Sequence, residues 1–263
     1  TAPDPAECQD PQTPCKNYNR ILAVAPSPIE KLITCGSFSR RCQYRELMNI
    51  SDSVEYERIV INANTPAVAV LHDDFMYVGV SPEFPAPENS PAYVTELHLD
   101  SLTLREKLNN QNVRASQEQF ALNFVNGFEF EGFTYFVTNQ QQLIGEDPPQ
   151  DHDYISKINR VCQDSDDLDS FTEVQLTCSL GSDRSYNLIQ AIEVSIPGKD
   201  LGESFNSSED PLLYAVFAES SEYTDEAADP AHSVLCIYKM SELLAKFKTA
   251  MEDCTRKGEV EVH

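Results

Sequence analysis

The sequence contains no tryptophan, and only nine of its 263 residues are glycine. Carbohydrate-binding sites commonly present exposed aromatic rings, so the lack of tryptophan argues against a lectin. The scarcity of glycine argues against a phosphate-binding cradle, and no Gly-x-Ser-x-Gly elbow, phosphate loop or dinucleotide fingerprint is present. The sequence thus offers no support for nucleotide-dependent enzymes or serine hydrolases.

Basic residues are scarce: 19 lysines and arginines stand against 43 aspartates and glutamates, for a net charge of −24. Nucleic-acid binding rests on clustered basic residues, and an anionic membrane surface attracts the same groups. The charge therefore argues against nucleic acid and against direct membrane contact. It fits a solvated surface, and an acidic face for a basic partner stays open as the alternative.

Long apolar segments are also missing, since no run approaches the roughly 20 residues of a membrane span. No basic start followed by an apolar segment marks a signal peptide. Residues 1–15 are instead rich in proline, aspartate and glutamine. We expect them to come from the inside of a longer protein or from a mature form.

No set of residues predicts a catalytic or metal centre, and we expect no cofactor. The five histidines are scattered, and none has a second histidine at metal-binding spacing. The acidic run 164–169 resembles a calcium loop but lacks its central glycine, with Leu168 and Gln175 where oxygen ligands should be. A glycosidase pair of carboxylates meets only in space, so a secreted hydrolase remains an alternative.

Eight cysteines are present, and four of them lie in two local pairs, Cys8 with Cys15 and Cys35 with Cys42. Neither pair has the Cys-x-x-Cys spacing of a zinc or redox site, and both lie in loop-rich sequence. They favour disulfides in an oxidising compartment over buried cytosolic thiols. Two Asn-x-Ser triplets, at Asn49 and Asn206, predict N-glycosylation and agree with that compartment.

Short runs of β-branched and aromatic residues, each bounded by Gly, Pro, Asp or Ser, predict strands through most of the chain. They recur as a strand, a short turn, an apolar strand, a longer loop and a third strand. The predicted groups are 20–25, 31–36 and 41–47; 67–71 and 75–80; 127–130, 133–137 and 154–161; and 187–195, 212–218 and 234–239, with a further strand at 171–178. The repeat favours a β-propeller over a sandwich or a barrel.

The remaining segments are predicted as a strap, loops and helices. Residues 1–19 form an irregular strap, and the acidic segments 82–91, 145–153, 164–169 and 219–232 form loops between strands. A short helix is predicted over 101–107. A longer helix over 241–252 begins at Ser241 as N-cap, and one face carries Leu243, Leu244, Phe247 and Met251. We expect this helix to lie across the edge of a propeller blade.

Several segments resemble the sema domain of the plexins, the cell-surface receptors of semaphorins. The resemblance is carried by GFTYFVTNQ at 132–140 and by YISKINRVC…VQLTC…YNLIQA…PG from 154 to 198, closed by SVLCIY at 233–238. The hepatocyte-growth-factor receptor group and the semaphorins share this domain more distantly, and the first motif favours the plexins. The resemblance implies an all-β, sema-type β-propeller, seven-bladed in that family, of which residues 1–263 span roughly half.

The resemblance also implies how the cysteines pair. Three bridges of the family correspond to Cys8–Cys15, Cys35–Cys42 and Cys178–Cys236. Cys162 and Cys254 correspond to positions whose partners lie further along the family sequence. We therefore expect the chain to be a fragment, and the alternatives are a bridge between these two cysteines or a part of the protein absent from the sequence.

The implied function is recognition without catalysis, in the extracellular region of a type I cell-surface receptor that acts in signalling, axon guidance and cell adhesion. The expected partner is a semaphorin, bound through propeller loops and blade edges, with a receptor homodimer as a further expectation. Loops 82–91 and 145–153 are candidates by composition alone, so the binding residues stay unknown. The alternatives are a receptor of the hepatocyte-growth-factor receptor group and a secreted propeller hydrolase or lectin.

Overall fold

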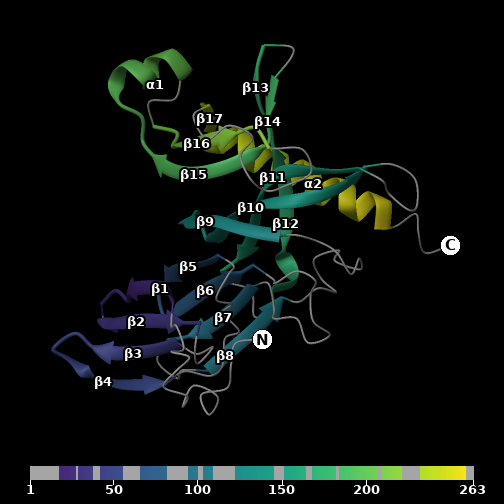
Figure 1. The fold of residues 1–263 in the computed structure, drawn as a ribbon. Helices are drawn as coiled ribbons and strands as arrows, with labels where there is room; N and C mark the ends of the chain where they lie inside the picture. The colour runs from purple at the N-terminus through teal and green to yellow at the C-terminus, as the bar shows by residue number, and fades with distance from the viewer. Residues whose placement is uncertain are drawn as a thin grey trace. The chain divides into compact units, whose positions relative to one another are not determined.

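The structure is a computed structural model that describes residues 18–27, 29–37, 42–55, 66–81, 94–99, 103–108, 122–144, 151–163, 168–181, 184–206, 209–220 and 232–258. Antiparallel sheets dominate this part of the chain, and α-helices occur in its last third (Figure 1). The all-β class predicted from the strand pattern is therefore confirmed.

Three four-stranded sheets follow one another, each with its strands in sequence order. The first contains β1 (Asn19–Val24), β2 (Lys31–Gly36), β3 (Cys42–Glu46) and β4 (Asn49–Glu55). The second contains β5 (Ala67–His72), β6 (Phe75–Val80), β7 (Val94–His98) and β8 (Thr103–Leu108). The third contains β9 (Leu122–Phe130), β10 (Phe133–Ile144), β11 (Asp151–Cys162) and β12 (Thr172–Leu176).

A two-stranded hairpin and a three-stranded sheet come next. The hairpin contains β13 (Cys178–Leu180) and β14 (Arg184–Tyr186), and the sheet contains β15 (Leu188–Ser195), β16 (Leu212–Ala218) and β17 (Ser233–Lys239). Helix α1 (Lys199–Phe205) connects β15 to β16, α2 (Met240–Gly258) follows β17, and the 3-10 turn η2 (Leu168–Ser170) precedes β12. The four larger sheets coincide with the four predicted strand groups.

The chain divides into two compact units, which we describe separately. Unit 1 comprises Thr1–Thr134 and Cys162–Asp169, and unit 2 comprises Tyr135–Val161 and Ser170–His263.

The core of unit 1 is an apolar cluster to which the first two sheets contribute. In β2, Ile33 and Cys35 are buried whereas Thr34 between them is only partly buried, as the alternation of a strand requires. The cluster consists of Ile21, Ala25, Ile29, Ile33, Cys35, Cys42, Met76, Val78, Val80, Leu97 and Leu99. Each fully buried aliphatic side chain stabilises the fold by roughly 1.5–3 kcal/mol before the entropy cost of ordering.

The turn from β9 to β10 explains the first residues of the GFTYFVTNQ motif. Glu131 and Gly132 both have positive φ, at 46° and 76°. A two-residue hairpin turn with two positive φ angles matches the right-handed twist of its strands, and glycine adopts this conformation without a steric cost. Gly132 therefore sets where β10 begins.

In unit 2, helix α2 covers part of the core with its predicted apolar face. Leu243 and Phe247 are buried, and the Phe247 ring lies 5.8 Å from the ring of Tyr135. The guanidinium carbon of Arg160 lies 4.5 Å from the centre of the same ring. Met251, which the sequence pattern placed on this face, is half-exposed, although its sulfur lies 3.5 Å from Arg160 Nη2.

Several predictions of local structure are wrong. Residues 101–107 do not form a helix, because 103–108 form strand β8, which pairs with β7. The segment contains leucine, arginine, glutamate and lysine, which favour helices, and the pairing overrides this weak preference. The sequence pattern also missed β4, β7, β14 and α1, and it joined β12 and the start of β13 into one strand over 171–178. Ser241 is not the N-cap of α2, because the helix begins at Met240, and the helix ends at Gly258, beyond the predicted Glu252.

Candidate functional site

The side chain of Asn139, in β10, hydrogen-bonds both backbone groups of one residue in β15. Its Nδ2 donates to the Ile189 carbonyl at 2.9 Å, and its Oδ1 accepts from the Ile189 N–H at 3.0 Å. These two bonds copy the exchange made between paired strands, but here a side chain makes them between two sheets. Asn139 is buried, so water cannot replace it as the partner of these groups.

Ser156, in β11, joins the same contact. Its hydroxyl lies 2.8 Å from Asn139 Oδ1 and 2.8 Å from the Asn187 carbonyl, and it accepts from the Ile189 N–H at 2.9 Å. The hydroxyl is therefore both donor and acceptor at the point where β10, β11 and β15 meet. Ser156 is also buried.

Asn187, which precedes β15, continues the contact toward the end of β16. Its Nδ2 donates to the Tyr154 carbonyl at 2.8 Å and to the Ser220 hydroxyl at 2.9 Å, and its Oδ1 accepts from the Ser220 N–H at 2.9 Å. We call the set of Asn139, Ser156, Asn187 and Ser220 the Asn–Ser junction. It fixes the third sheet's β10 and β11 against the three-stranded sheet within unit 2.

The Asn–Ser junction was not found by sequence reasoning, although three of its members lie in the motifs quoted above. The apolar residues of those segments predict strands, and this prediction does not single out the polar positions among them. The available signal is a polar residue at a position where the alternation predicts burial, because such a residue needs an internal hydrogen-bond partner. Asn139 and Ser156 are positions of this kind.

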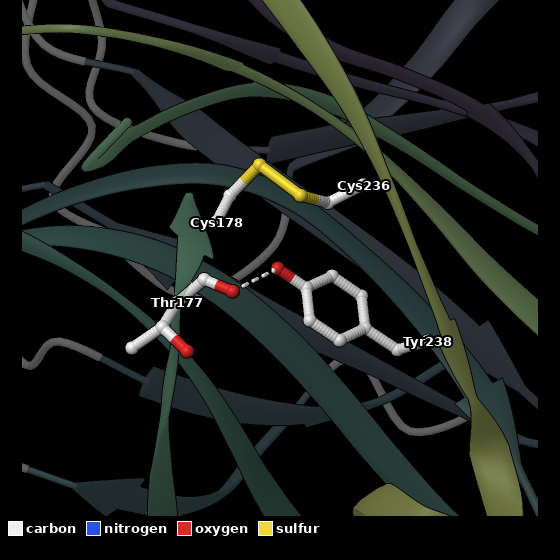
Figure 2. The surroundings of a disulfide bond; sticks show 4 residues. All are labelled: Thr177, Cys178, Cys236 and Tyr238. Carbon is white, nitrogen blue, oxygen red and sulfur yellow. Dashed lines mark hydrogen bonds between the residues drawn. A yellow bond between two sulfur atoms is a disulfide. The ribbon is translucent and has the colours of Figure 1, made fainter. Parts of the chain in front are cut away.

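A disulfide attaches the β13–β14 hairpin to β17. Cys178 and Cys236 are 58 residues apart in the sequence and are bonded, with their Cα atoms 6.0 Å apart (Figure 2). Cys178 is buried, whereas Cys236 is half-buried. This is the long-range bridge that the family resemblance implied.

Tyr238 makes a second attachment beside the disulfide. Its hydroxyl donates to the Thr177 carbonyl at 2.9 Å, directly before Cys178 (Figure 2). Burial raises the pKa of Tyr238 to about 12, because the phenolate would lose its hydration. The tyrosine is therefore a neutral donor at physiological pH.

The clamped hairpin, residues 178–186, presents exposed side chains from a fixed base. Its register pairs Cys178 with Tyr186 and Leu180 with Arg184, and Gly181 in the connection has a φ of 70°. The Leu180 side chain is 60% exposed, whereas Tyr186 is buried. Such an arrangement presents an exposed apolar side chain from a base that the disulfide holds in place.

In unit 1, the second predicted bridge closes a hairpin. Cys35 and Cys42 are paired residues of β2 and β3, and their sulfurs are bonded. Both cysteines are buried in the apolar cluster. The bridge therefore holds the base of the 36–41 connection, as the strand prediction indicated.

Unit 1 also buries an ion pair on the second sheet. Glu96 Oε1 lies 3.1 Å from Arg105 Nη1, and only 1% of the Glu96 side chain is exposed. Burial raises the pKa of the adjacent Tyr77, and the negative charge of Glu96 raises it further. The guanidinium carbon of Arg105 also lies 4.7 Å from the ring centre of Phe75. Glu96 and Arg105 therefore neutralise each other within unit 1 and do not form a charged binding site that is open to solvent.

The remaining predicted site residues are distributed as follows. Cys8 and Cys15, the loop 82–91 and residues 145–150 lie outside the described residues. Residues 151–153, predicted as the end of a loop, instead form the start of β11. Cys162 is half-buried at the end of β11, and Cys254 lies in α2. Asn49 and Asn206 are both exposed. The possible partners of Cys162 and Cys254 thus remain predictions.

Within the parts of the chain that the structure describes, no group of three or more His, Cys, Asp and Glu residues is arranged to hold a metal ion. The Nδ1 of His72 instead lies 2.5 Å from Oε2 of Glu129.

None of the described helices combines the length and the apolar character needed to cross a bilayer.

Comparison with known proteins gives relatives along nearly the whole chain. No protein-family model matches the sequence. Plexin-A2 from Homo sapiens is 24% identical over 287 residues, which covers 97% of this chain and 15% of the relative. Plexin A3 from Danio rerio is 29% identical over 140 residues, 52% of this chain and 7% of the relative. The chain therefore spans only a small part of the length of these curated relatives.

The solved structures agree with the sequence relatives. The plexin A4 extracellular region superimposes with a TM-score of 0.77 at 21% identity, over 95% of this chain and 30% of that chain. Drosophila Plexin A in complex with Semaphorin 1b gives a TM-score of 0.57 at 20% identity, over 87% of this chain and 41% of that chain. The resemblance to plexins is confirmed, and the fold is a partial β-propeller of the sema type.

Proposed function

We propose that this chain is part of the extracellular ligand-binding region of a cell-surface receptor of the plexin kind, and that it binds a semaphorin without catalysing a reaction. The observation that carries the proposal is the alignment of 97% of the chain with human plexin-A2, together with the likeness to a plexin extracellular region. A structural neighbour that contains Plexin A in complex with Semaphorin 1b supports the choice of ligand. Attachment to the cell as a type I membrane protein and receptor homodimerisation belong to the same proposal.

The internal geometry supports a binding role because it stiffens the sheets from which loops and hairpins emerge. The Asn–Ser junction joins β10 and β11 to the three-stranded sheet through buried hydrogen bonds. The Cys178–Cys236 bridge holds the clamped hairpin at its base. A rigid scaffold with exposed connections is the usual basis of protein recognition, because little order has to be gained on binding.

The direct test is a binding measurement on the chain secreted by mammalian cells. The purified chain is immobilised, and a panel of semaphorin ectodomains is passed over it while surface plasmon resonance is recorded. We expect saturable binding of at least one semaphorin, and we expect it to be lost after reduction and alkylation of the cysteines. Failure of every semaphorin to bind the oxidised chain would overturn the proposal, and hepatocyte growth factor in the same panel tests the related receptor group.

The clamped hairpin gives the described residues a candidate contact. Leu180→Arg places a charge on its exposed edge, and we expect weaker semaphorin binding with the Cys178–Cys236 bridge intact. Ile196→Arg is the matched control, because Ile196 is 57% exposed and Leu180 is 60% exposed in the same unit. Equal binding by both variants would remove the hairpin from the contact and leave the loops 82–91 and 145–153 as the sequence-based candidates.

A further inference from the structure

Strand β4 is an edge strand that exposes apolar side chains. Among the described residues it pairs only with β3, so its outer backbone groups face away from the sheet. Four apolar residues of the β3–β4 turn and of β4 are exposed: Leu47, Met48, Ile50 and Val54, with Met48 at 99%. An exposed edge strand with apolar side chains is a template for pairing with another chain, and folded proteins normally block such edges.

The acceptor triplet Asn49-Ile50-Ser51 lies within this exposed segment. Asn49 is the first residue of β4 and pairs with Glu46 across the turn. Asn49, Ile50 and Ser51 are all exposed. The Asn49 Nδ2 donates to Asp52 Oδ2 at 2.8 Å, so the amide is on the surface and its nitrogen is oriented by a neighbour in the same strand.

We infer that Asn49 carries an N-linked oligosaccharide, and that this oligosaccharide covers the β4 edge and its apolar residues. A branched, strongly hydrated sugar on the first residue of the strand separates that edge from other chains. It adds to the exposed charge of Asp52, which by itself is the kind of residue that blocks an edge strand. The β4 edge is then unavailable to protein partners, which restricts semaphorin contacts to other surfaces.

The attachment chemistry requires one co-reactant, a lipid-pyrophosphate-linked oligosaccharide of the secretory pathway. The amide nitrogen Nδ2 forms a bond to the anomeric carbon of the first sugar, and the bond from that carbon to the pyrophosphate oxygen breaks. The lipid pyrophosphate leaves with the bonding electrons, and one proton is lost from Nδ2. The second hydrogen stays on Nδ2, so the hydrogen bond to Asp52 is retained.

This inference rests on the proposed extracellular location, and the experiment separates the two. The chain is expressed in mammalian cells behind an added secretion signal, recovered from the medium, and treated with a peptide-N-glycosidase, which leaves aspartate at each modified asparagine. Peptide mass spectrometry then identifies asparagine or aspartate at position 49 and shows whether Cys35 and Cys42 form a disulfide. We expect aspartate at 49 and a disulfide between the cysteines. Reduced, retained protein contradicts the location, whereas a secreted, oxidised chain with unmodified Asn49 contradicts only this inference.

Two substitutions at one position test the covering role. Ser51→Ala destroys the acceptor triplet but leaves Asn49 and its bond to Asp52, and Ser51→Thr preserves the triplet as the matched control. We expect the alanine variant to shift from monomer to larger species in size-exclusion chromatography with light scattering, and the threonine variant to stay monomeric. An alanine variant that lacks the sugar and remains monomeric at every accessible concentration would overturn the covering role.

Discussion

The two units join their sheets by different means. In unit 1, the first two sheets share an apolar cluster in which Ile33, Met76 and Leu97 are fully buried. In unit 2, β10 and β11 are joined to β15 by the Asn–Ser junction, in which buried side chains bond backbone groups. The strength of the apolar contact depends on the buried area and on the volume of the side chains. The strength of the hydrogen-bonded contact depends on the direction of each bond and on whether every buried polar group has a partner.

The difference predicts how each contact responds to substitution. An apolar contact tolerates a residue of similar volume, since dispersion and hydrophobic burial are nearly independent of direction. Replacing a buried amide by an apolar side chain leaves the backbone donors and acceptors that it bonded without partners. The two disulfides show a parallel difference, because one closes a hairpin and the other closes a long loop. The following variants test these contrasts.

The largest effect is expected for the long-range disulfide. Cys178 and Cys236 are separated by 58 positions in the sequence, whereas Cys35 and Cys42 are separated by 7. Because a disulfide lowers the entropy of the unfolded chain, the first bridge is expected to stabilise the fold by about 4 kcal/mol and the second by about 2 kcal/mol. The two double alanine variants are compared by urea unfolding under identical oxidising conditions. Equal losses of unfolding free energy would show that loop length does not govern the stabilisation.

The next effect concerns the Asn–Ser junction. Asn139→Leu keeps the number and branching of the side-chain heavy atoms but removes both bonds to Ile189, and we expect the free energy of unfolding to fall by about 3 kcal/mol. Gln190→Ala is the control, because Gln190 is exposed on the neighbouring strand and makes only a weak 3.4 Å bond to Leu188. We expect about 0.5 kcal/mol or less for the control. A loss as small as this for Asn139→Leu would contradict the role assigned to the junction.

A smaller effect is expected for the matching change in unit 1. Ile33→Leu conserves volume in the apolar cluster, and we expect a loss of about 1 kcal/mol by the same urea measurement. The comparison with Asn139→Leu uses the same incoming residue at two buried positions. If both variants lost the same free energy, the proposed difference between directional and non-directional junctions would be wrong.

The same difference explains what could be predicted from the sequence. The four strand groups and the buried face of α2 were predicted because apolar periodicity reports which side chains lack water. The ends of β16 and β6 were predicted to the residue, since Pro, Ser and Asp bound these strands. The disulfides Cys35–Cys42 and Cys178–Cys236 agree with the implied pairing.

The directional features could not be predicted in the same way. The partner of Asn139 lies 50 residues away in the sequence, and nothing near Asn139 specifies Ile189. Strand β8 was missed because its composition favours a helix and only its pairing with β7 decides the outcome. Local sequence reports propensity and burial, whereas these features depend on which strands become neighbours.

The smallest expected effect concerns the hydrogen bond beside the long-range disulfide. Tyr238→Phe removes the donor of an exposed hydrogen bond to the Thr177 carbonyl, and we expect a loss of about 0.5 kcal/mol near neutral pH. The pH dependence gives a sharper test, because folding raises the pKa of Tyr238 from 10.0 to about 12.

Between these two values the unfolded chain releases the Tyr238 proton while the folded chain keeps it. The folded state then binds more protons, so stability falls as the pH rises through this range. Urea unfolding from pH 9 upward, at about one-unit intervals, should therefore show an alkaline loss in the parent chain that is smaller in Tyr238→Phe. Parallel curves for the two proteins would mean that Tyr238 ionises equally in the folded and unfolded states, and that burial does not disfavour its phenolate.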